Sequence, residues 1–245
     1  MFFCFVAVWQ GGRMSMVKVK ICGLRRLEDA QIVNEAKPDY IGFILTPSKR
    51  RVTIPEALAI SGALHPSIRR VGVFAGESPA EIAQTASKLS LDGIQLHMDT
   101  TTPFLDALAY ELGHCLFTRI PFVWQRIPVP ASAVDASDIE ESLHSFADFS
   151  RFDGLLLDTR KEKSDGGAGL VFPWKPAAEY LDSHNISSSR IIVAGGLDEN
   201  NVSDAIAFFL PYAVDVSSGV ETDGFKDRQK VLRFIETARK AQVHE

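Results

Sequence analysis

The chain has 245 residues, of which 46% are hydrophobic and 23% charged, and its formal net charge is −5. This composition is ordinary for a globular protein and supplies enough apolar side chains for a large core. A mildly acidic chain without a block of Lys and Arg gives no electrostatic reason to expect nucleic acid or a membrane as partner. An anionic small molecule remains open as a ligand, because backbone N–H groups at helix N-termini can hold a phosphate.

The first residues of the chain, MFFCFVAVWQ, form an apolar stretch whose role has to be decided before the fold. The stretch is too short to span a bilayer, which takes ~20 residues. It also lacks the positive region and the small-residue cleavage site of a secretory signal. We expect residues 1–15 to lie outside the fold and residues 16–245 to form one domain. A tail that seeks a membrane is the alternative.

Short apolar runs rich in Val, Ile, Leu and Phe recur along the chain after Met16. Several are almost continuous in apolar residues, which is typical of strands covered on both faces. The predicted strands are 17–22, 40–45, 69–74, 92–97, 114–120, 152–158, 190–195 and 213–218.

Amphipathic stretches alternate with these strands and predict helices. Pro55 and Pro79 fit first-turn positions, where proline is favoured. Three prolines in 121–137 predict a long loop between the fifth strand and its helix. The predicted helices are 27–36, 55–64, 79–89, 102–112, 138–147, 175–184, 199–209 and 225–241.

Eight strands alternating with eight helices are typical of an α/β fold, a single (β/α)8 barrel of parallel strands. Such barrels commonly run to 200–250 residues as one domain. An open, doubly wound sheet is the alternative, and it places a glycine-rich phosphate loop after its first strand. Here that position holds Cys22-Gly23-Leu24-Arg25, and the glycine-rich turns come late in the chain. This favours the barrel, which often binds phosphate after its seventh and eighth strands.

Two late loops carry the residues expected to bind phosphate. Each follows a predicted strand and precedes a predicted helix, so its backbone N–H groups can form a nest for a phosphate dianion. Either loop alone would also fit a tight connection without function, but two neighbouring loops favour phosphate binding. The glycine-rich segment 165–169 predicts a flap over the ligand. The predicted phosphate ligands are Gly195, Gly196, Ser217, Ser218 and Gly219.

Cys22 and Asp158 end predicted strands on the side where barrels carry out chemistry. A lone cysteine is commonly structural. Its thiol has an unperturbed pKa of ~8.5, which nearby positive charge lowers, so it could also act as a base. A carboxylate after Leu155-Leu156-Leu157 is costly unless it is solvated, paired or working, and partial desolvation suits a general acid. A base and an acid across the barrel mouth would suit isomerisation of a sugar.

Three further polar residues belong to the same end of the predicted barrel. Gln95 and His97 end the fourth strand, where they bind a ligand or satisfy a hydrogen bond at the rim. Arg50 lies in the loop after the second strand. The three cysteines, Cys4, Cys22 and Cys115, show no CxxC spacing and no clustering with His, which predicts neither a metal site nor a disulfide framework. A reducing, cytoplasmic setting fits this pattern.

Taken together these motifs, over residues 17–240, resemble the phosphoribosylanthranilate isomerase family of tryptophan biosynthesis. Each motif is weak alone, whereas their common order is specific. The chain departs from the family pattern at Met98 and Pro173. The motifs are Lys20-Ile21-Cys22-Gly23, Gly42-Phe43, Ser48-Lys49-Arg50, Val71-Gly72-Val73-Phe74, Gln95-Leu96-His97, Leu156-Leu157-Asp158-Thr159, Gly166-Gly167-Ala168-Gly169, Ala194-Gly195-Gly196-Leu197 and Asp215-Val216-Ser217-Ser218-Gly219-Val220-Glu221.

The resemblance implies an Amadori rearrangement of a phosphorylated small molecule, N-(5′-phosphoribosyl)anthranilate, without metal or cofactor. It implies that Asp158 protonates the ribose ring oxygen as general acid and that Cys22 removes the C2′ proton as general base. It also implies that Arg50 faces the anthranilate carboxylate and that the late glycine loops hold phosphate. We expect a cytoplasmic monomer or homodimer.

Two other functions fit parts of the pattern. The related barrel isomerase of histidine biosynthesis performs the same rearrangement on another substrate, but it uses aspartate where Cys22 stands. A catalytically idle barrel could bind phosphorylated metabolites, but a pure binder needs neither Cys22 nor Asp158. Turnover of freshly generated phosphoribosylanthranilate separates the three.

Overall fold

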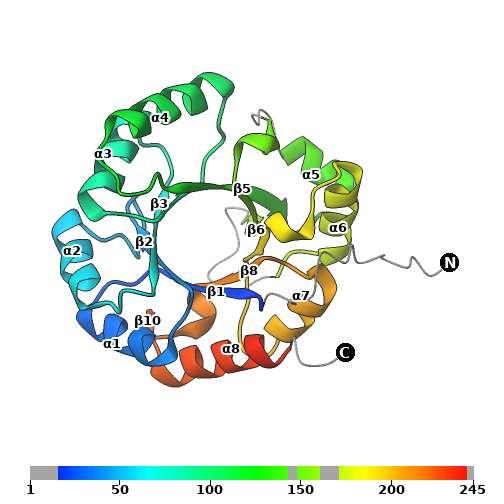
Figure 1. Cartoon of the computed structure of the whole chain (residues 1–245). Coiled ribbons are helices and arrows are strands. Elements are labelled where there is room, and N and C mark those ends of the chain that lie inside the picture. The colour runs from blue at the N-terminus through cyan, green and yellow to red at the C-terminus, as the bar shows by residue number, and fades with distance from the viewer. Residues whose placement is uncertain (1–15, 143–147, 161–170, 242–245) are drawn as a thin grey trace.

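The computed structural model describes residues 16–142, 148–160 and 171–241. Eight parallel strands close into a barrel in chain order, with β1 hydrogen-bonded to both β2 and β8 (Figure 1). The predicted (β/α)8 barrel is therefore confirmed. The strands are β1 (Lys18–Cys22), β2 (Tyr40–Ile44), β3 (Arg69–Phe74), β4 (Gly93–Leu96), β5 (Phe122–Pro130), β6 (Gly154–Arg160), β7 (Ile191–Val193) and β8 (Ala213–Val216).

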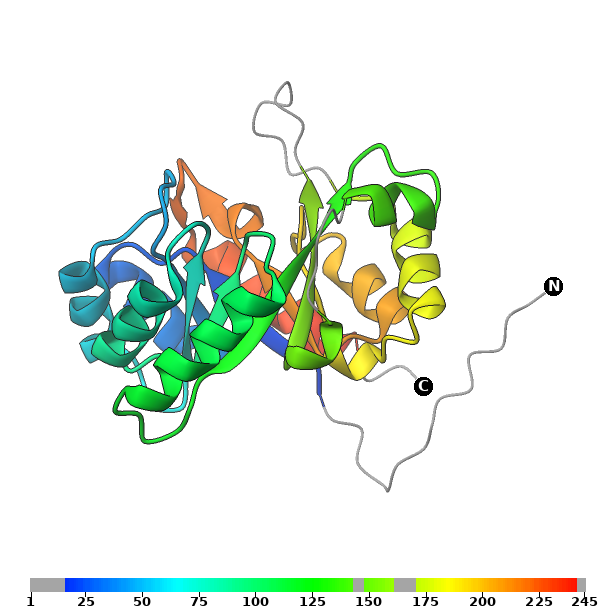
Figure 2. The ribbon, with the colours of Figure 1, turned by 90° about the horizontal axis from the view of Figure 1, so that it is seen from above.

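The helices surround the barrel and cover the outer face of its strands (Figures 1 and 2). A small antiparallel hairpin, β9 (Glu221–Thr222) and β10 (Phe225–Lys226), follows the 3₁₀ helix η3 (Ser218–Val220). The helices are α1 (Leu27–Ala36), α2 (Ile54–Ala63), α3 (Pro79–Leu89), α4 (Thr102–His114), α5 (Ala136–Ser142), α6 (Trp174–Ser183), α7 (Val202–Phe209) and α8 (Arg228–Lys240).

Local sequence signals explain where α2 and α3 begin. Thr53 and Ser78 cap them, and each hydroxyl accepts a hydrogen bond from the backbone N–H of a glutamate three residues later. The glutamate side chain returns to the cap, which makes a capping box. Pro55 and Pro79 lie in the first turns, as predicted. These helix starts fix how the loops after β2 and β3 leave the barrel.

The fifth strand is where the sequence prediction is wrong. Residues 114–120 do not form a strand; α4 continues to His114, and Leu116 in the following segment is 96% exposed. The strand is 122–130, inside the stretch predicted as a loop. Its first half pairs with β4 only as far as Gln125, whereas its second half pairs with β6 alone. Pro128 and Pro130 fall in this one-sided half, where a missing N–H is tolerated as on an edge strand.

Side chains alternate between the barrel interior and the helices. At one end the interior is filled by a separate apolar cluster of buried side chains. Above it, Lys20, Gln95 and Asp215 are buried polar residues that face the barrel interior. Cys22, two residues after Lys20 on β1, and Asp158 on β6 face the same interior. The polar layer therefore lies toward the carboxyl ends of the strands. The apolar cluster consists of Tyr40, Val71, Trp124, Leu156, Ile192, Ala194 and Ala213.

Removing residues 1–15 is expected to leave the barrel intact, because β1 begins at Lys18. The melting temperature should stay within about 3 °C of the full chain, corresponding to roughly 1 kcal/mol for a chain of this size. Thermal melting of the two chains tests this. Removing residues 1–20 takes most of β1 away and serves as the positive control for lost stability. A large decrease after the shorter deletion would show that residues 1–15 support the fold.

Candidate active site

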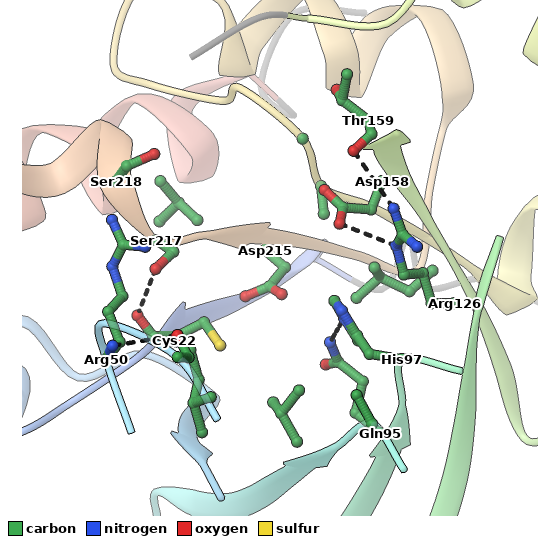
Figure 3. A pocket seen from close by; sticks show the side chains of 18 of the residues that line it. Cys22, Arg50, Gln95, His97, Arg126, Asp158, Thr159, Asp215, Ser217 and Ser218 are labelled. Atoms are coloured by element: carbon green, nitrogen blue, oxygen red, sulfur yellow. Dashed lines mark hydrogen bonds and ion pairs between the residues drawn. The ribbon is translucent and has the colours of Figure 1, made fainter. Parts of the chain in front are cut away.

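A pocket of about 560 Å³ opens where the strands end at their carboxyl side. Nine of the ten predicted site residues line it: Cys22, Arg50, Gln95, His97, Asp158, Gly195, Gly196, Ser217 and Ser218. The tenth, Gly219, is not among the lining residues. Figure 3 shows Cys22 and Asp158 on facing walls of this pocket. The structure therefore brings the separate motifs of the sequence to one site.

Cys22 ends β1 and lies opposite Gly42 of β2 in the parallel register. A Cβ atom at Gly42 would lie 2.6 Å from the Cys22 sulfur, closer than any real contact. Glycine at this position therefore makes room for the thiol. The Cys22 carbonyl accepts a hydrogen bond of 3.1 Å from the Ser217 hydroxyl, which ties the end of β1 to the loop after β8.

The electrostatics of Cys22 differ from the simple expectation of a lowered thiol pKa. Burial raises the pKa of Cys22 above its ordinary value, and this effect exceeds the opposing one of the Lys20 ammonium. Asp215 raises the pKa further, while Lys226 lowers it. The folded chain thus holds Cys22 mainly as a thiol at neutral pH, and the charges of Lys20 and Lys226 reduce the free-energy cost of forming its thiolate.

Asp158 projects from β6 and is 25% exposed. The Arg126 Nε, on β5, lies 3.1 Å from its Oδ2, and an Arg126 terminal nitrogen lies 3.4 Å from the Thr159 carbonyl oxygen. The other carboxylate oxygen lies beside the Gly195 turn, where an added Cβ would be 3.2 Å away. Asp158 thus lies between a cation and the predicted phosphate loop.

Arg50 crosses Gly23 and reaches the hairpin after β8. Its Nε and Nη2 donate to the Glu221 carboxylate at 2.8 and 2.7 Å, in a bidentate pair. The Glu221 carboxylate also accepts from the buried Lys226 at 2.8 Å. Burial raises the pKa of Glu221, but the two cations lower it more, so the net pKa lies below its ordinary range. Arg50 is thereby held at the pocket wall by an ionised partner.

Gln95 and His97 face the same wall from β4 and its end. Their Nε2 atoms lie 2.5 Å apart, so the amide donates to an unprotonated ring nitrogen. Burial, aided by the charges of Arg126 and Lys20, lowers the pKa of His97 to about 3. His97 is therefore neutral at physiological pH and is not an acid catalyst. The Gln95 Oε1 is buried without a hydrogen-bond partner among the described residues.

The two loops predicted to bind phosphate adjoin one another. Gly195 and Gly196 have φ values of +71° and +76°, and a Cβ at Gly195 would lie 2.5 Å from the Thr159 backbone nitrogen. A Cβ at Gly219 would lie 2.0 Å from the Leu197 carbonyl oxygen, so glycine there lets the loop after β8 approach the loop after β7. The predicted flap at 165–169 lies outside the described residues.

Five charged residues of this site were missed in the sequence. Lys20, Asp215 and Glu221 stand in sequence motifs that were recognised, but no role was assigned to their side chains. The two-residue spacing from Cys22 could have placed Lys20 on the same face of the strand as the thiol. Arg126 fell in the stretch interpreted as a loop. No sequence signal joined Glu221 or Lys226 to Arg50, because the contact depends on how the β9–β10 hairpin folds back. The missed residues are Lys20, Arg126, Asp215, Glu221 and Lys226.

The described part of the chain has neither a cluster of metal-binding side chains nor a helix that could span a membrane. In 16–142, 148–160 and 171–241, no three His, Cys, Asp or Glu side chains are grouped so that they could hold a metal ion. Within the same ranges, no helix has the length and apolar character needed to cross a membrane.

Comparisons with known proteins agree on one family. Residues 19–237 match the family model described as N-(5′-phosphoribosyl)anthranilate (PRA) isomerase. A relative of that name from Acetivibrio thermocellus is 42% identical over 226 residues, which are 92% of this chain and 97% of the relative. The chain is also similar to a solved structure of monomers of the dimeric enzyme from Thermotoga maritima, at 34% identity and a TM-score of 0.72, covering 92% of this chain and all of that one.

A second solved structure contains a ligand. It is a phosphoribosyl anthranilate isomerase in complex with reduced 1-(o-carboxyphenylamino)-1-deoxyribulose 5-phosphate. The two chains are 33% identical with a TM-score of 0.71, and the match covers 92% of this chain and 100% of that chain.

The depressed pKa of His97 predicts a pH-dependent stability. At pH values between the ordinary pKa of 6.5 and the folded-state pKa of about 3, His97 is protonated in the unfolded chain but not in the folded chain. Unfolding free energy therefore falls as pH decreases through this window, by up to about 1.4 kcal/mol per pH unit. Relative to wild type, the His97→Gln variant should gain about 2 kcal/mol when the pH changes from about 7 to about 5.

Urea unfolding at the two pH values measures this gain. The matched control is His65→Gln, because His65 is exposed and far from the pocket. If the unfolding free energies of wild type and His97→Gln differed by the same amount at both pH values, the neutral state of His97 in the folded chain would be contradicted.

Proposed function

The chain belongs to the N-(5′-phosphoribosyl)anthranilate isomerase family, and from this premise we propose that Asp158 and Cys22 act as its general acid and base. The reaction is the Amadori rearrangement of N-(5′-phosphoribosyl)anthranilate to 1-(2-carboxyphenylamino)-1-deoxy-D-ribulose 5-phosphate in L-tryptophan biosynthesis. The observation that carries the assignment of roles is the placement of Cys22 and Asp158 on facing walls of one pocket.

The first step opens the ribose ring. Asp158 delivers a proton to the ring oxygen, the C1′–O bond breaks, and the anthranilate nitrogen supplies its electron pair to form a Schiff base. An acid has to bring this proton, so Arg126 has to release Asp158 when substrate binds. The substrate carries two anions of its own, and either can attract the guanidinium away from the Asp158 carboxylate.

The second step moves the double bond. The thiolate form of Cys22 removes the proton on C2′, and the electron pair of that C–H bond neutralises the Schiff base to give an enolamine. The enolamine tautomerises to the ketone, with a proton delivered to C1′. The substrate therefore leaves as a ketose without any change in its overall composition. Both steps are proton transfers that side chains supply, and we propose that they need neither cofactor nor metal.

Binding energy comes from the two anionic ends of the substrate. We propose that the turns at Gly195-Gly196 and Ser217-Ser218-Gly219 bind the phosphate through backbone N–H groups. Arg50, held by Glu221, is proposed to present its guanidinium to the anthranilate carboxylate. Gln95 and His97 are proposed to contact the ribose between these ends, where the buried Gln95 Oε1 can accept from a hydroxyl group.

We propose that the chain works as a monomer or a homodimer in the cytoplasm, on a small phosphorylated substrate and without nucleic acid. The dimeric enzyme from Thermotoga maritima supports the dimeric alternative. Sedimentation of the purified chain distinguishes the two assemblies.

Replacing either proposed catalytic group should abolish most turnover without unfolding the chain. Cys22→Ser keeps the shape but exchanges the thiol for a hydroxyl that is far harder to deprotonate. Asp158→Asn removes the transferable proton. Acid or base catalysis contributes ~10²–10⁴-fold, so kcat on freshly generated phosphoribosylanthranilate should fall at least that much. Loss of the substrate's fluorescence measures kcat.

Thermal melting and affinity for a reduced product analogue are measured on the same two variants. Both should stay near wild type, because the phosphate loops are unchanged. A Cys22→Ser chain with near wild-type kcat would sink the proposed base. A parallel loss of stability and activity would instead mark the residue as structural.

Arg50→Ala should weaken substrate binding more than it weakens the fold. A charge-assisted hydrogen bond is worth roughly 1.5–3 kcal/mol, so kcat/KM should fall by at least about tenfold. Glu221 keeps Lys226 as a partner, which limits the effect on stability. The neighbouring Arg51→Ala is the matched control, because Arg51 is exposed and outside the pocket lining. Equal kinetics of the two variants would place the carboxylate contact elsewhere.

A further inference from the structure

A lysine is buried inside the barrel directly below the proposed base. Lys20 is 0% exposed, and its Nζ lies 2.9 Å from the Asp215 Oδ2. The pairing register places Lys20 beside Asp215, since β1 and β8 are neighbours and these two residues are Cα partners. Both side chains are buried, and the second carboxylate oxygen, Asp215 Oδ1, has no hydrogen-bond partner among the described residues.

Lys20 and Cys22 share a face because side chains two residues apart on a strand point the same way. The two side chains are close enough for the Lys20 ammonium to lower the pKa of the Cys22 thiol, against the larger effect of burial. Both side chains meet at Gly42, where an added Cβ would lie 2.6 Å from the Cys22 sulfur and 3.2 Å from the Lys20 Cε. Glycine on β2 therefore lets the lysine stem and the thiol lie against the same stretch of backbone.

The stability of the barrel does not by itself explain why a lysine and a carboxylate are buried side by side at this position. Two apolar side chains would fill the same space, and buried ion pairs are often no more stabilising than such replacements. Burial lowers the pKa of Lys20, but the charges of Asp215 and Cys22 raise it more, so the net pKa lies above its ordinary value. Lys20 is thus a cation buried beside the thiol of Cys22.

We propose that Lys20 is a positioning residue of the isomerase, whose ammonium holds the negative charge that Cys22 carries when it acts as a base. This proposal rests on the proposed role of Cys22. The charge of a thiolate is not solvated inside the barrel, and a cation in contact with it is worth far more there than in water. Asp215 keeps the cation charged and fixes its place, at the cost of a negative charge near the sulfur.

Other charged side chains also lie near Cys22, and their effects on its pKa have to be distinguished from that of Lys20. Lys226 approaches from β10, where it is held by Glu221 and by the Ser217 carbonyl oxygen. Arg50 approaches from the loop after β2. Lys226 has the smaller effect on the thiol and is the better control, because it is also a buried lysine with a carboxylate partner.

The test compares two variants that differ only in the ammonium. Asp215→Asn keeps the Lys20 ammonium without its carboxylate, whereas the double variant Lys20→Met, Asp215→Asn keeps neither charge of the pair. Ultraviolet absorbance of thiolate is followed against pH in each, and the spectrum of the same chain with Cys22→Ser is subtracted. This difference reports Cys22 alone and excludes Cys4 and Cys115.

The midpoint of Cys22 ionisation should lie higher in the double variant by at least about one pH unit, or tenfold less thiolate at a given pH below the midpoint. The pH at which kcat/KM rises should shift by the same amount. Lys226→Met should shift the midpoint less. Equal midpoints in the two Asp215→Asn chains would overturn the role of Lys20, with melting curves showing that both are folded.

The thiolate titration does not depend on turnover. A shifted midpoint together with normal turnover of Cys22→Ser would leave Lys20 as the partner of the thiolate but would refute Cys22 as the base. An unshifted midpoint together with an inactive Cys22→Ser would refute the role of Lys20 alone.

Discussion

Every second side chain of a closed barrel points to its axis, where a charge has no water around it and needs a partner. In this chain the constraint falls on Lys20 and Asp215, whose strands are neighbours and whose side chains pair at 2.9 Å. The same alternation brings Cys22 above Lys20, on a face that Gly42 leaves open. The reactive thiol is thereby joined to a charged layer that only the closure of β1 against β8 can create.

A second set of charged side chains, Arg50, Glu221 and Lys226, lies beside this layer, and Arg50 lines the pocket. Glu221 is shared by Arg50 and Lys226, which come from the loop after β2 and from the β9–β10 hairpin. Both segments rise from the same end of the barrel in Figure 2. Asp158 has its own cation in Arg126 on the opposite wall. In this arrangement the anions of the substrate enter a site in which Arg50 and Arg126 already have carboxylate partners.

The strands that contribute the proposed acid and base could be predicted, because apolar residues alternate in 17–22 and are continuous in Leu155-Leu156-Leu157. A single reactive residue, Cys22 or Asp158, stands at the end of each apolar pattern. The fifth strand could not, because the tolerance for Pro128 and Pro130 depends on β4 ending early, which is a property of the pairing and not of the segment. Arg126, which lies on that strand, was therefore not predicted as a site residue. Glu221 and Lys226 were not predicted either, because their contact with Arg50 depends on how the β9–β10 hairpin folds back. The sequence alone led to the proposed acid and base, whereas the charged partners of these two residues could be found only in the fold.

A crystal structure with the reduced product analogue bound tests the central claim most directly. The account predicts the phosphate at the Gly195-Gly196 and Ser217-Ser218 turns and the Cys22 sulfur within about 3.5 Å of C2′, the reach of a near-attack geometry. It also predicts Arg126 turned away from Asp158, with the carboxylate facing the position of the ring oxygen. An analogue whose C2′ lies against another wall, with Cys22 covered by protein, would contradict the account.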